Sequence, residues 1–436
     1  MVTLTSWQSR AGSVALCLLW AVGCGFDPGG QGGGSNADGG GSEADGGGTI
    51  HGRDGSPEPG EDAGPGPDGG GCGELLPFAP SNFDPCLLGA PNGALLLEDG
   101  GDEYLIDTDL GMLTGPGVQQ LLVGAVIDQT GAPDIFVVVT PSFTLGADAV
   151  LGVDGSRAFA LVATGDIIIA GGLSAGAVAE GSGPGGDNEE ACAEARGDNG
   201  QLQTRPPFDG AGSGGGGGGF AAAGGAGAPV DQSVDPDPTS GGAAGGEATL
   251  VPLRGGCAGG TGGVDGLNGG DGGGGGGALQ LVAGGAITVD GIVTARGGGG
   301  RGISSAVDGG AGGGGGSGGG LLLEAMTVAV NGSVTANGGA GGEGTRSGNT
   351  ASPGEDGLDA SGARAQGGAN SNEGGDGGDG GALEAVGGAN GLPGDSTPAD
   401  LAGGGGGGGS AGRIRLRSIS GEPAIGDQAV VSPAPQ

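Results

Sequence analysis

The chain has 436 residues, of which 125 are glycine and only 3% are aromatic, and its formal net charge is −37. Glycine is about four times as frequent as its usual ~7% share, yet it lacks the strict every-third-residue period of collagen. The scarcity of aromatic residues argues against a conventional close-packed core over the whole length. The negative charge argues against a nucleic-acid-binding protein, because it would repel phosphate.

Residues 1–23 have the pattern of a signal peptide. A weakly basic leader precedes an apolar run, residues 11–22, which is too short to span a bilayer. The run ends in Ala21-Val22-Gly23-Cys24, which resembles the lipobox of bacterial lipoproteins. That resemblance implies lipidation of Cys24 and, because Gly25 rather than Asp follows it, a location at the outer membrane and cell surface. Ala21 replaces the usual leucine, so ordinary cleavage followed by secretion is the alternative.

The next two predicted regions are a linker and a cap. Residues 24–71 are almost wholly Gly, Asp, Glu, Ser and Pro, which cannot bury enough apolar surface to order the chain, so we expect a lipid-anchored disordered linker. Residues 72–134 are expected to form an N-terminal cap that bears a disulfide and the first strands. In an exported chain, the four cysteines that follow Cys24 are expected to form two disulfides. Three connectivities are possible, and the preferred one pairs nearest neighbours, Cys72–Cys86 and Cys192–Cys257.

Residues 135–420 contain a repeated pattern of short alternating apolar runs. Period-two alternation indicates strands with one side chain in two directed inward. The copies are Phe159, Leu161, Ala163, Ile167, Ile169, Leu173, Ala175; Leu279, Leu281, Ala283, Ile287, Val289, Val293, Ala295; and Leu321, Leu323, Ala325, Val328, Val330, Val334, Ala336. Residues 158–175 and 278–295 align without a gap.

Three short strands in each copy predict one coil of a right-handed parallel β-helix, an all-β solenoid, with a β-sandwich as the alternative fold. In the solenoid, Leu161, Leu281 and Leu323 should lie above one another.

Glycine-rich inserts interrupt the predicted solenoid at residues 176–277, 297–320, 337–381 and 387–411, and residues 421–436 form a C-terminal tail. The first three begin after the third strand of a copy, so we expect long glycine-rich insertions at one corner, side by side along one flank. Glycine chains have no Cβ to separate them, so lateral hydrogen bonding of the polyglycine II type is one hypothesis. Disordered loops are the alternative, because glycine loses much entropy on ordering.

Three segments of the sequence resemble those of a known group of bacterial surface proteins. The lipobox, the unit GALQLVAGGAITVDGIVTARGGGG and the ending GGGGGSAGRIRLRS are similar to those of glycine-rich, β-helical predicted surface lipoproteins of gliding, predatory Gram-negative bacteria. The similarity to mycobacterial PE-PGRS proteins is one of composition only. The resemblance implies a cell-envelope location and no established activity.

One basic stripe stands out from an acidic chain. Arg413, Arg415 and Arg417 alternate with apolar residues, so on a strand they share one face. Such a face could bind phosphate or carboxylate groups of an envelope polysaccharide. The alternative is that it neutralises the protein's own acidic loops.

The remaining candidates for chemistry are weak. His51 is the single histidine in the sequence and lies in a Gly/Pro/Asp-rich stretch. A histidine-based catalytic triad or a histidine-rich metal site is therefore close to excluded. A cluster of acidic residues could hold calcium, namely Asp99, Asp102, Glu103, Asp107 and Asp109. A solvated acidic turn is the preferred interpretation, and no cofactor or metal is expected.

Many parallel β-helices are polysaccharide lyases or hydrolases, which need grouped acids on an outward face. Here the outward positions are mostly neutral, such as Gln280, with scattered acids such as Glu324. We therefore expect a non-catalytic surface lipoprotein, structural or adhesive, with the membrane and envelope polysaccharide as partners.

Overall fold

The computed structural model describes residues 75–98, 103–203, 210–230, 238–263, 269–303, 309–346, 350–370, 373–383, 385–396 and 401–436. The chain divides into two compact units, Met1–Gly64 and Pro65–Gln436, and all described residues belong to the second. The predicted signal peptide, Cys24, the linker and Cys72 lie outside the described residues.

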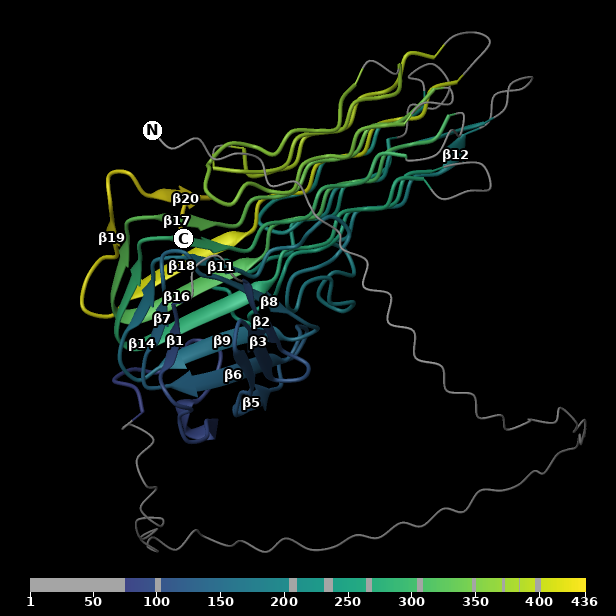
Figure 1. Cartoon of the computed structure of the whole chain (residues 1–436). Helices are drawn as coiled ribbons and strands as arrows, with labels where there is room; N and C mark the ends of the chain where they lie inside the picture. Colours follow the sequence, from purple (N-terminus) through teal and green to yellow (C-terminus); the bar gives the residue numbers. More distant parts are fainter. Residues whose placement is uncertain are drawn as a thin grey trace, which may run out of the picture. The chain divides into compact units, whose positions relative to one another are not determined.

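The described part is all-β, as predicted, with one short 3-10 helix, η2 (Pro85–Leu87). Its strands form two curled sheets and one two-stranded ribbon (Figure 1). The ten-stranded sheet contains β1 (Leu95–Leu97), β5 (Gly124–Ile127), β6 (Ile135–Thr140), β7 (Phe143–Leu145), β9 (Ala158–Ala163), β10 (Ile167–Ile169), β14 (Ala278–Val289), β16 (Gly320–Val330), β18 (Arg413–Ser418) and β19 (Ala424–Ile425). The eight-stranded sheet contains β2 (Glu103–Asp107), β3 (Met112–Gly115), β4 (Val118–Leu121), β8 (Val150–Asp154), β11 (Gly172–Ser174), β15 (Ile292–Thr294), β17 (Ser333–Thr335) and β20 (Val430–Ser432). The ribbon pairs β12 (Leu202–Gln203) with β13 (Ala211–Gly212).

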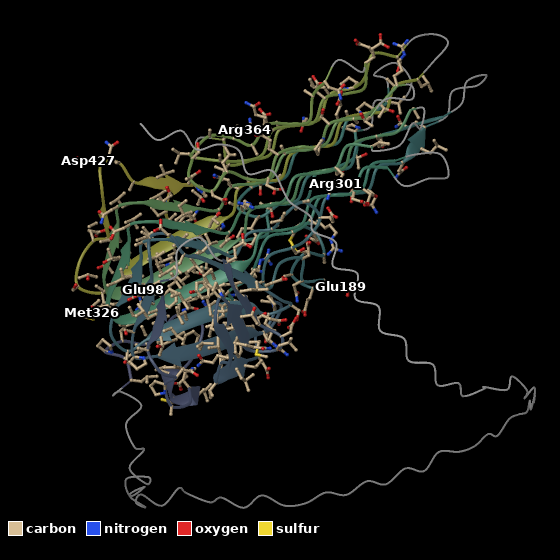
Figure 2. The ribbon with its side chains drawn as sticks, in the orientation of Figure 1. Glu98, Glu189, Arg301, Met326, Arg364 and Asp427 are labelled. Atoms are coloured by element: carbon tan, nitrogen blue, oxygen red, sulfur yellow. A yellow bond between two sulfur atoms is a disulfide. The ribbon has the colours of Figure 1, made fainter. Side chains whose placement is uncertain are left out.

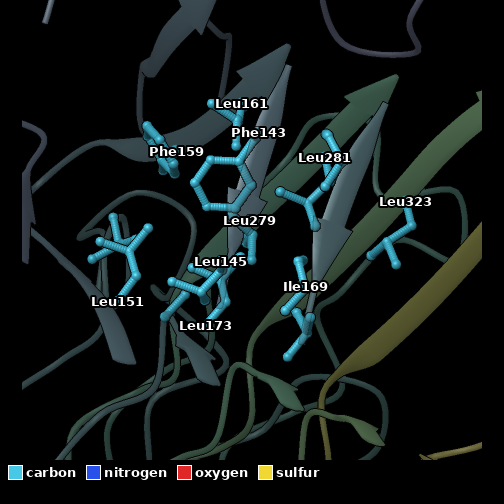
Figure 3. Packing of buried hydrophobic residues seen from close by; sticks show 14 of the residues in the cluster. Phe143, Leu145, Leu151, Phe159, Leu161, Ile169, Leu173, Leu279, Leu281 and Leu323 are labelled. Atoms are coloured by element: carbon cyan, nitrogen blue, oxygen red, sulfur yellow. The ribbon is translucent and has the colours of Figure 1, made fainter. Parts of the chain in front are cut away.

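The predicted alignment of the repeats is confirmed by the strand register. Leu161 lies opposite Leu281 in the parallel pair β9–β14, and Leu281 lies opposite Leu323 in the parallel pair β14–β16. All three are buried, and Figure 3 shows them between the strands. In the other sheet Leu173 faces Val293, which faces Val334, so the third strands of the copies also stack in parallel.

One expectation about the strands is wrong. The first two strands of a copy were predicted to be separate, but β14 and β16 each run through both positions. β14 pairs with both β9 and β10, because Gly284 and Gly285 form a register irregularity between Ala283 and Ala286 instead of a corner.

The sheets are mixed, since β2–β3–β4 and β5–β6 are antiparallel, and β2 to β5 lie within the residues predicted as the cap. Gly111 and Gly117, at φ values of 63° and 68°, allow the tight turns that join β2, β3 and β4.

The main core lies between the two sheets and is aliphatic with a few phenylalanine rings, such as Phe143 and Phe159 (Figure 3). A second apolar layer covers the outward side of β6, β9 and β14, where residues 75–88 and 250–253 pack. Gln280 and Glu324 were expected on an open outward face, but both are fully buried beneath this layer. The neutral outward positions of the repeat therefore belong partly to a second core, which the alternation alone does not reveal.

Candidate functional site: the glycine bundle

Three glycine-rich inserts leave the sheets from stacked positions, and we call their extended segments together the glycine bundle. Ala175, Ala295 and Ala336 directly follow β11, β15 and β17, whose strands pair in register. Each insert returns beside the residue where it left. The returning bonds are Gly277 N to Ala175 O at 2.7 Å, Gly319 N to Ala295 O at 2.7 Å, and Gly412 N to Ala336 O at 2.6 Å. The bundle is thus continuous with the strands, and it extends from one side of them (Figure 1).

Segment 311–319 shows how the bundle is held together. Its successive amides donate to three different neighbours in turn, namely segments 257–263, 404–410 and 295–301. Carbonyl groups of residues 309–317 accept from three more neighbours, segments 212–218, 270–276 and 339–345. A chain with three residues per turn and no internal hydrogen bonds directs its polar groups in this way. Six neighbours around one extended chain is the arrangement of polyglycine II.

Three further segments have the same surroundings. Residues 212–219, 337–345 and 403–412 each exchange backbone hydrogen bonds with neighbours on six sides, and at least two of those neighbours are other interior segments. The lateral packing hypothesized from the glycine runs is therefore what the structure contains, and the disordered-loop alternative is wrong for these segments. Figure 2 shows the result, with side chains crowding the strands and sparse along the bundle.

Glycine is required in the interior because carbonyl oxygens occupy the space of a side chain. A Cβ on Gly314 would lie 2.0 Å from the Gly216 carbonyl oxygen, and one on Gly316 would lie 2.0 Å from the Gly274 carbonyl oxygen. Residues with side chains instead occupy the periphery, such as Asp376 and Asp379 in the run of residues 374–381. The period-three Gly-Gly-Asp pattern there is the sequence signal that could have revealed this geometry.

Carboxylates complete the hydrogen bonding at the edge of the bundle, a role that the sequence did not indicate. Each of three acids accepts from the amides of two segments. Asp187 accepts from Ala258 N and Gly275 N, Asp356 from Ala179 N and Gly299 N, and Glu343 from Ser352 N and Asn370 N. Each therefore substitutes for a missing neighbouring chain. Burial raises the pKa of Glu343, against the opposing effect of its two backbone donors.

The predicted Cys192–Cys257 disulfide is present, with a Cα–Cα distance of 5.6 Å. Both cysteines are buried, and they join the turn that precedes segment 195–201 to segment 257–263 at one side of the bundle. Cys72, and with it the predicted pairing to Cys86, lies outside the described residues.

The three arginines of the basic stripe lie on β18, as predicted, but bond within the chain. Arg417 donates to Glu324 at 2.8 Å and lies 5.7 Å from the centre of the Phe78 ring, measured from Cζ. Arg413 donates to the Gly246 carbonyl and to the side chain of Gln436, and Arg415 donates to the Thr249 carbonyl. These contacts use some of the guanidinium N–H groups that would otherwise bind an external anion. Polysaccharide binding by the basic stripe therefore stays a prediction.

The acids considered for calcium are used locally. Asp107 accepts from two following backbone amides, and Asp109 accepts from Ser156 and lies 3.4 Å from Arg157 Nη1. Asp99 and Asp102 lie outside the described residues. Among the residues that the structure describes, no three His, Cys, Asp or Glu side chains are grouped to hold a metal ion.

A cleft of about 360 Å³ at the side of the bundle contains Glu180, Asp271 and Arg301. These are the residue types that the rival glycosidase or lyase interpretation would need. Glu180 is engaged by Arg301, whose Nη2 lies 2.7 Å from Oε2, and this hydrogen bond lowers the pKa of Glu180. A general acid needs a raised pKa, so Glu180 is poorly suited to that role.

The described part of the chain contains no helix of the length and apolar character needed to cross a bilayer. Compared with protein families, with curated proteins and with solved structures, the chain matches none. Function is therefore inferred from the geometry of the bundle and its supporting strands.

Proposed function

We propose that the chain is a non-catalytic surface lipoprotein of the cell envelope, and that the glycine bundle is its rigid structural or adhesive element. The observation that carries the proposal is the direct continuation of stacked strands into hydrogen-bonded glycine segments, with Gly319 N bonded to Ala295 O where an insert meets the sheet. Because the strands are rigid and continue directly into the glycine segments, they hold the bundle at a defined position, as a stalk or an adhesive surface requires.

For the strands, the proposal includes a short right-handed parallel β-helix. Parallel pairing of β9–β14–β16–β18 in one sheet, and of β8–β11–β15–β17–β20 in the other, supports successive coils that contribute to both sheets in the same order. A β-sandwich would not be expected to repeat the same parallel order in both sheets. The antiparallel strands β3, β4 and β5 would then close one end of the solenoid.

The chemistry of the bundle favours a structural role. Its interior presents backbone groups that are bonded to one another, and its edge carboxylates are occupied by amides such as Ala258 N and Gly299 N. Such groups are not available to transfer protons to a substrate. The acidic exterior supports solubility and disfavours nucleic acid as a partner.

Anchoring at Cys24 is part of the same proposal, supported by the resemblance of residues 21–24 to a lipobox. Several acyl chains on one residue would hold the protein firmly in the outer membrane. Envelope polysaccharide is the proposed contact of the exposed part, and no cofactor is required.

Metabolic labelling with an alkyne fatty acid in a Gram-negative host tests the anchor. The wild-type chain should be labelled, should fractionate with outer membranes and should be cleaved by protease added to intact cells. Cys24→Ala should lose both label and membrane association, whereas Cys17→Ala should lose neither. A wild-type chain that stays unlabelled and is released to the medium would refute the anchored form.

The non-catalytic role is tested with the purified protein and acidic polysaccharides. Retention on a polysaccharide column without shortening of the chains supports an adhesive protein. New reducing ends or unsaturated products would instead identify the carbohydrate-active alternative.

A further inference from the structure

A second cleft, of about 580 Å³, lies beside the ribbon of β12 and β13. Figure 1 shows β12 at the end of the glycine bundle that lies away from the sheets. The volume is within the ~300–1,000 Å³ that is usual for sites of small ligands. Apart from Pro238, the lining consists of polar residues, namely Asp198, Asn199, Gln201, Gln203, Ser213, Thr239 and Ser240.

The polar groups of this cleft are held in place by the surrounding backbone. Asp198 N donates to the Ser240 carbonyl at 3.1 Å, which joins the two segments that contribute most of the lining. The hydroxyl of Ser213, which is buried, accepts from the Gln201 amide at 2.8 Å and lies 3.0 Å from the Thr239 hydroxyl. The site is therefore ordered before a ligand arrives, which lowers the entropic cost of binding.

Two side-chain amides in the cleft are oriented by bonds to the chain behind them. Asn199 Oδ1 accepts from Thr261 N at 2.9 Å, and Gln203 Oε1 accepts from Val230 N at 3.0 Å. Because each oxygen is bound, the NH₂ group of each amide remains as the donor, and no hydrogen bond between described residues uses it. The exposed Asp198 carboxylate likewise accepts no hydrogen bond from the described residues. The cleft thus presents oriented donors beside an acceptor.

We propose that this cleft binds a neutral saccharide, with the amides of Asn199 and Gln203 donating to sugar hydroxyls and a hydroxyl donating to Asp198. A hydroxyl both donates and accepts, so adjacent sugar hydroxyls match donors that lie beside an acceptor. An apolar ligand would instead leave these groups unpaired, at a cost for each.

Charge selects among saccharides. The lining contains one carboxylate and no cation, and the whole chain carries a net charge of −37, so an acidic saccharide would be repelled. The inference rests on the proposed adhesive function, for which it names the class of polysaccharide.

Affinity electrophoresis of the full chain carrying Cys24→Ser, which has no acylation site, tests the cleft without any dependence on the anchor. The net charge of −37 moves the protein through a native gel at neutral pH, and a neutral glycan held in the gel retards it only by binding. We expect retardation by at least one of three probes, soluble glucan, mannan and galactan. Added polygalacturonate should not restore the mobility.

Asn199→Asp with Gln203→Glu removes both donors but retains the oxygens that accept from the backbone behind them, so the fold should stay intact. The dissociation constant should rise on the order of tenfold. The control Asn390→Asp with Gln366→Glu adds the same charge outside the cleft, and Asn390 Oδ1 likewise accepts from a backbone amide of the bundle. The control should have little effect, once each variant is compared with its own mobility in a gel without glycan.

Ser240→Trp fills the cleft and should abolish the retardation. The proposal fails if all three glycans leave the mobility of the parent unchanged, or if Ser240→Trp, folded by circular dichroism, is retarded like the parent. It also fails if the Asn390 control loses as much affinity as the Asn199 variant. Retention on an acidic polysaccharide column without binding of any neutral glycan would overturn this inference and leave the proposed function in place.

Discussion

Glu324 on β16 and Arg417 on β18 form a 2.8 Å ion pair beneath the segment that begins the described chain. Glu324 is fully buried and also accepts from the hydroxyl and amide of Ser81 and from the side chain of Gln280. One carboxylate therefore connects two neighbouring strands to the N-terminal segment 75–88.

Arg417→Ala should destabilise the protein strongly. It leaves the buried Glu324 carboxylate without its positive partner, and removing one member of a buried pair costs about 3 kcal/mol or more. Chemical denaturation should show this loss, and Arg417→Ala combined with Glu324→Gln should recover part of it. Arg415→Ala is the matched control, because within the described part of the chain Arg415 donates to the exposed backbone carbonyl of Thr249 and to no carboxylate. Equal effects of the two single variants would contradict the role given to Glu324.

Gly314→Ala should disrupt the glycine bundle. The added methyl group would lie 2.0 Å from the Gly216 carbonyl oxygen, and that backbone is held by neighbours of its own. We expect a loss of about 3 kcal/mol, the upper part of the range for overpacking. Thermal unfolding measures the loss, and hydrogen exchange should show faster exchange in segments 212–219 and 339–345. Gly89→Ala, where nothing lies within 4 Å of the added atom, should leave both measurements unchanged.

Asp187→Ala tests whether carboxylates complete the bundle at its edge. The substitution removes the acceptor of Ala258 N and Gly275 N, and each unsatisfied buried amide costs about 1–3 kcal/mol. Both amides should lose protection from hydrogen exchange, while the amide of Gly314, which donates elsewhere, should keep it. Asp187→Asn retains one acceptor oxygen and should give an intermediate loss. Unchanged protection at Ala258 in the alanine variant would show that the cap is dispensable.

Glu343 should make the stability of the bundle depend on pH. Burial raises the pKa of the Glu343 carboxyl above that of an ordinary glutamate, so the folded state binds the proton more tightly than the unfolded chain. Stability should therefore increase as the pH falls from neutral through the folded pKa, and should level off below the unfolded value. Glu343→Gln should flatten this part of the stability profile between pH 7.5 and pH 5, whereas Glu355→Gln, an edge acid of the same type, should not. A wild-type profile that declines steadily over this range would count against the assignment.

The repeat was readable from the sequence because its physical cause is local. Alternating aliphatic residues with the same spacing in two copies predict strands that stack, and Leu161, Leu281 and Leu323 do so. The disulfide between Cys192 and Cys257 was predicted from an even number of cysteines in a chain that we expect to be exported. The common exit of the inserts followed from their position after the third strand.

The second apolar layer and the edge carboxylates could not be predicted, because they depend on segments far apart in the sequence. Gln280 has the alternation of an exposed residue, yet Asn82 and Leu250 cover it. Asp187 looks like any other loop acid until Ala258 and Gly275 are brought beside it. Among the described residues, the chemistry of the acids is decided by which amides approach them and not by the pattern around them.

The interior segments also impose an order of assembly. Segment 212–219, in the first insert, takes hydrogen bonds from segment 404–410, in the last. Contacts between such distant parts of a chain form slowly, since the closure entropy must be met before they can stabilise the fold. A polypeptide translocated from its N-terminus would hold its first insert incomplete until residues 403–412 had crossed the membrane. If the chain is exported as proposed, assembly of the bundle would therefore coincide with the end of translocation.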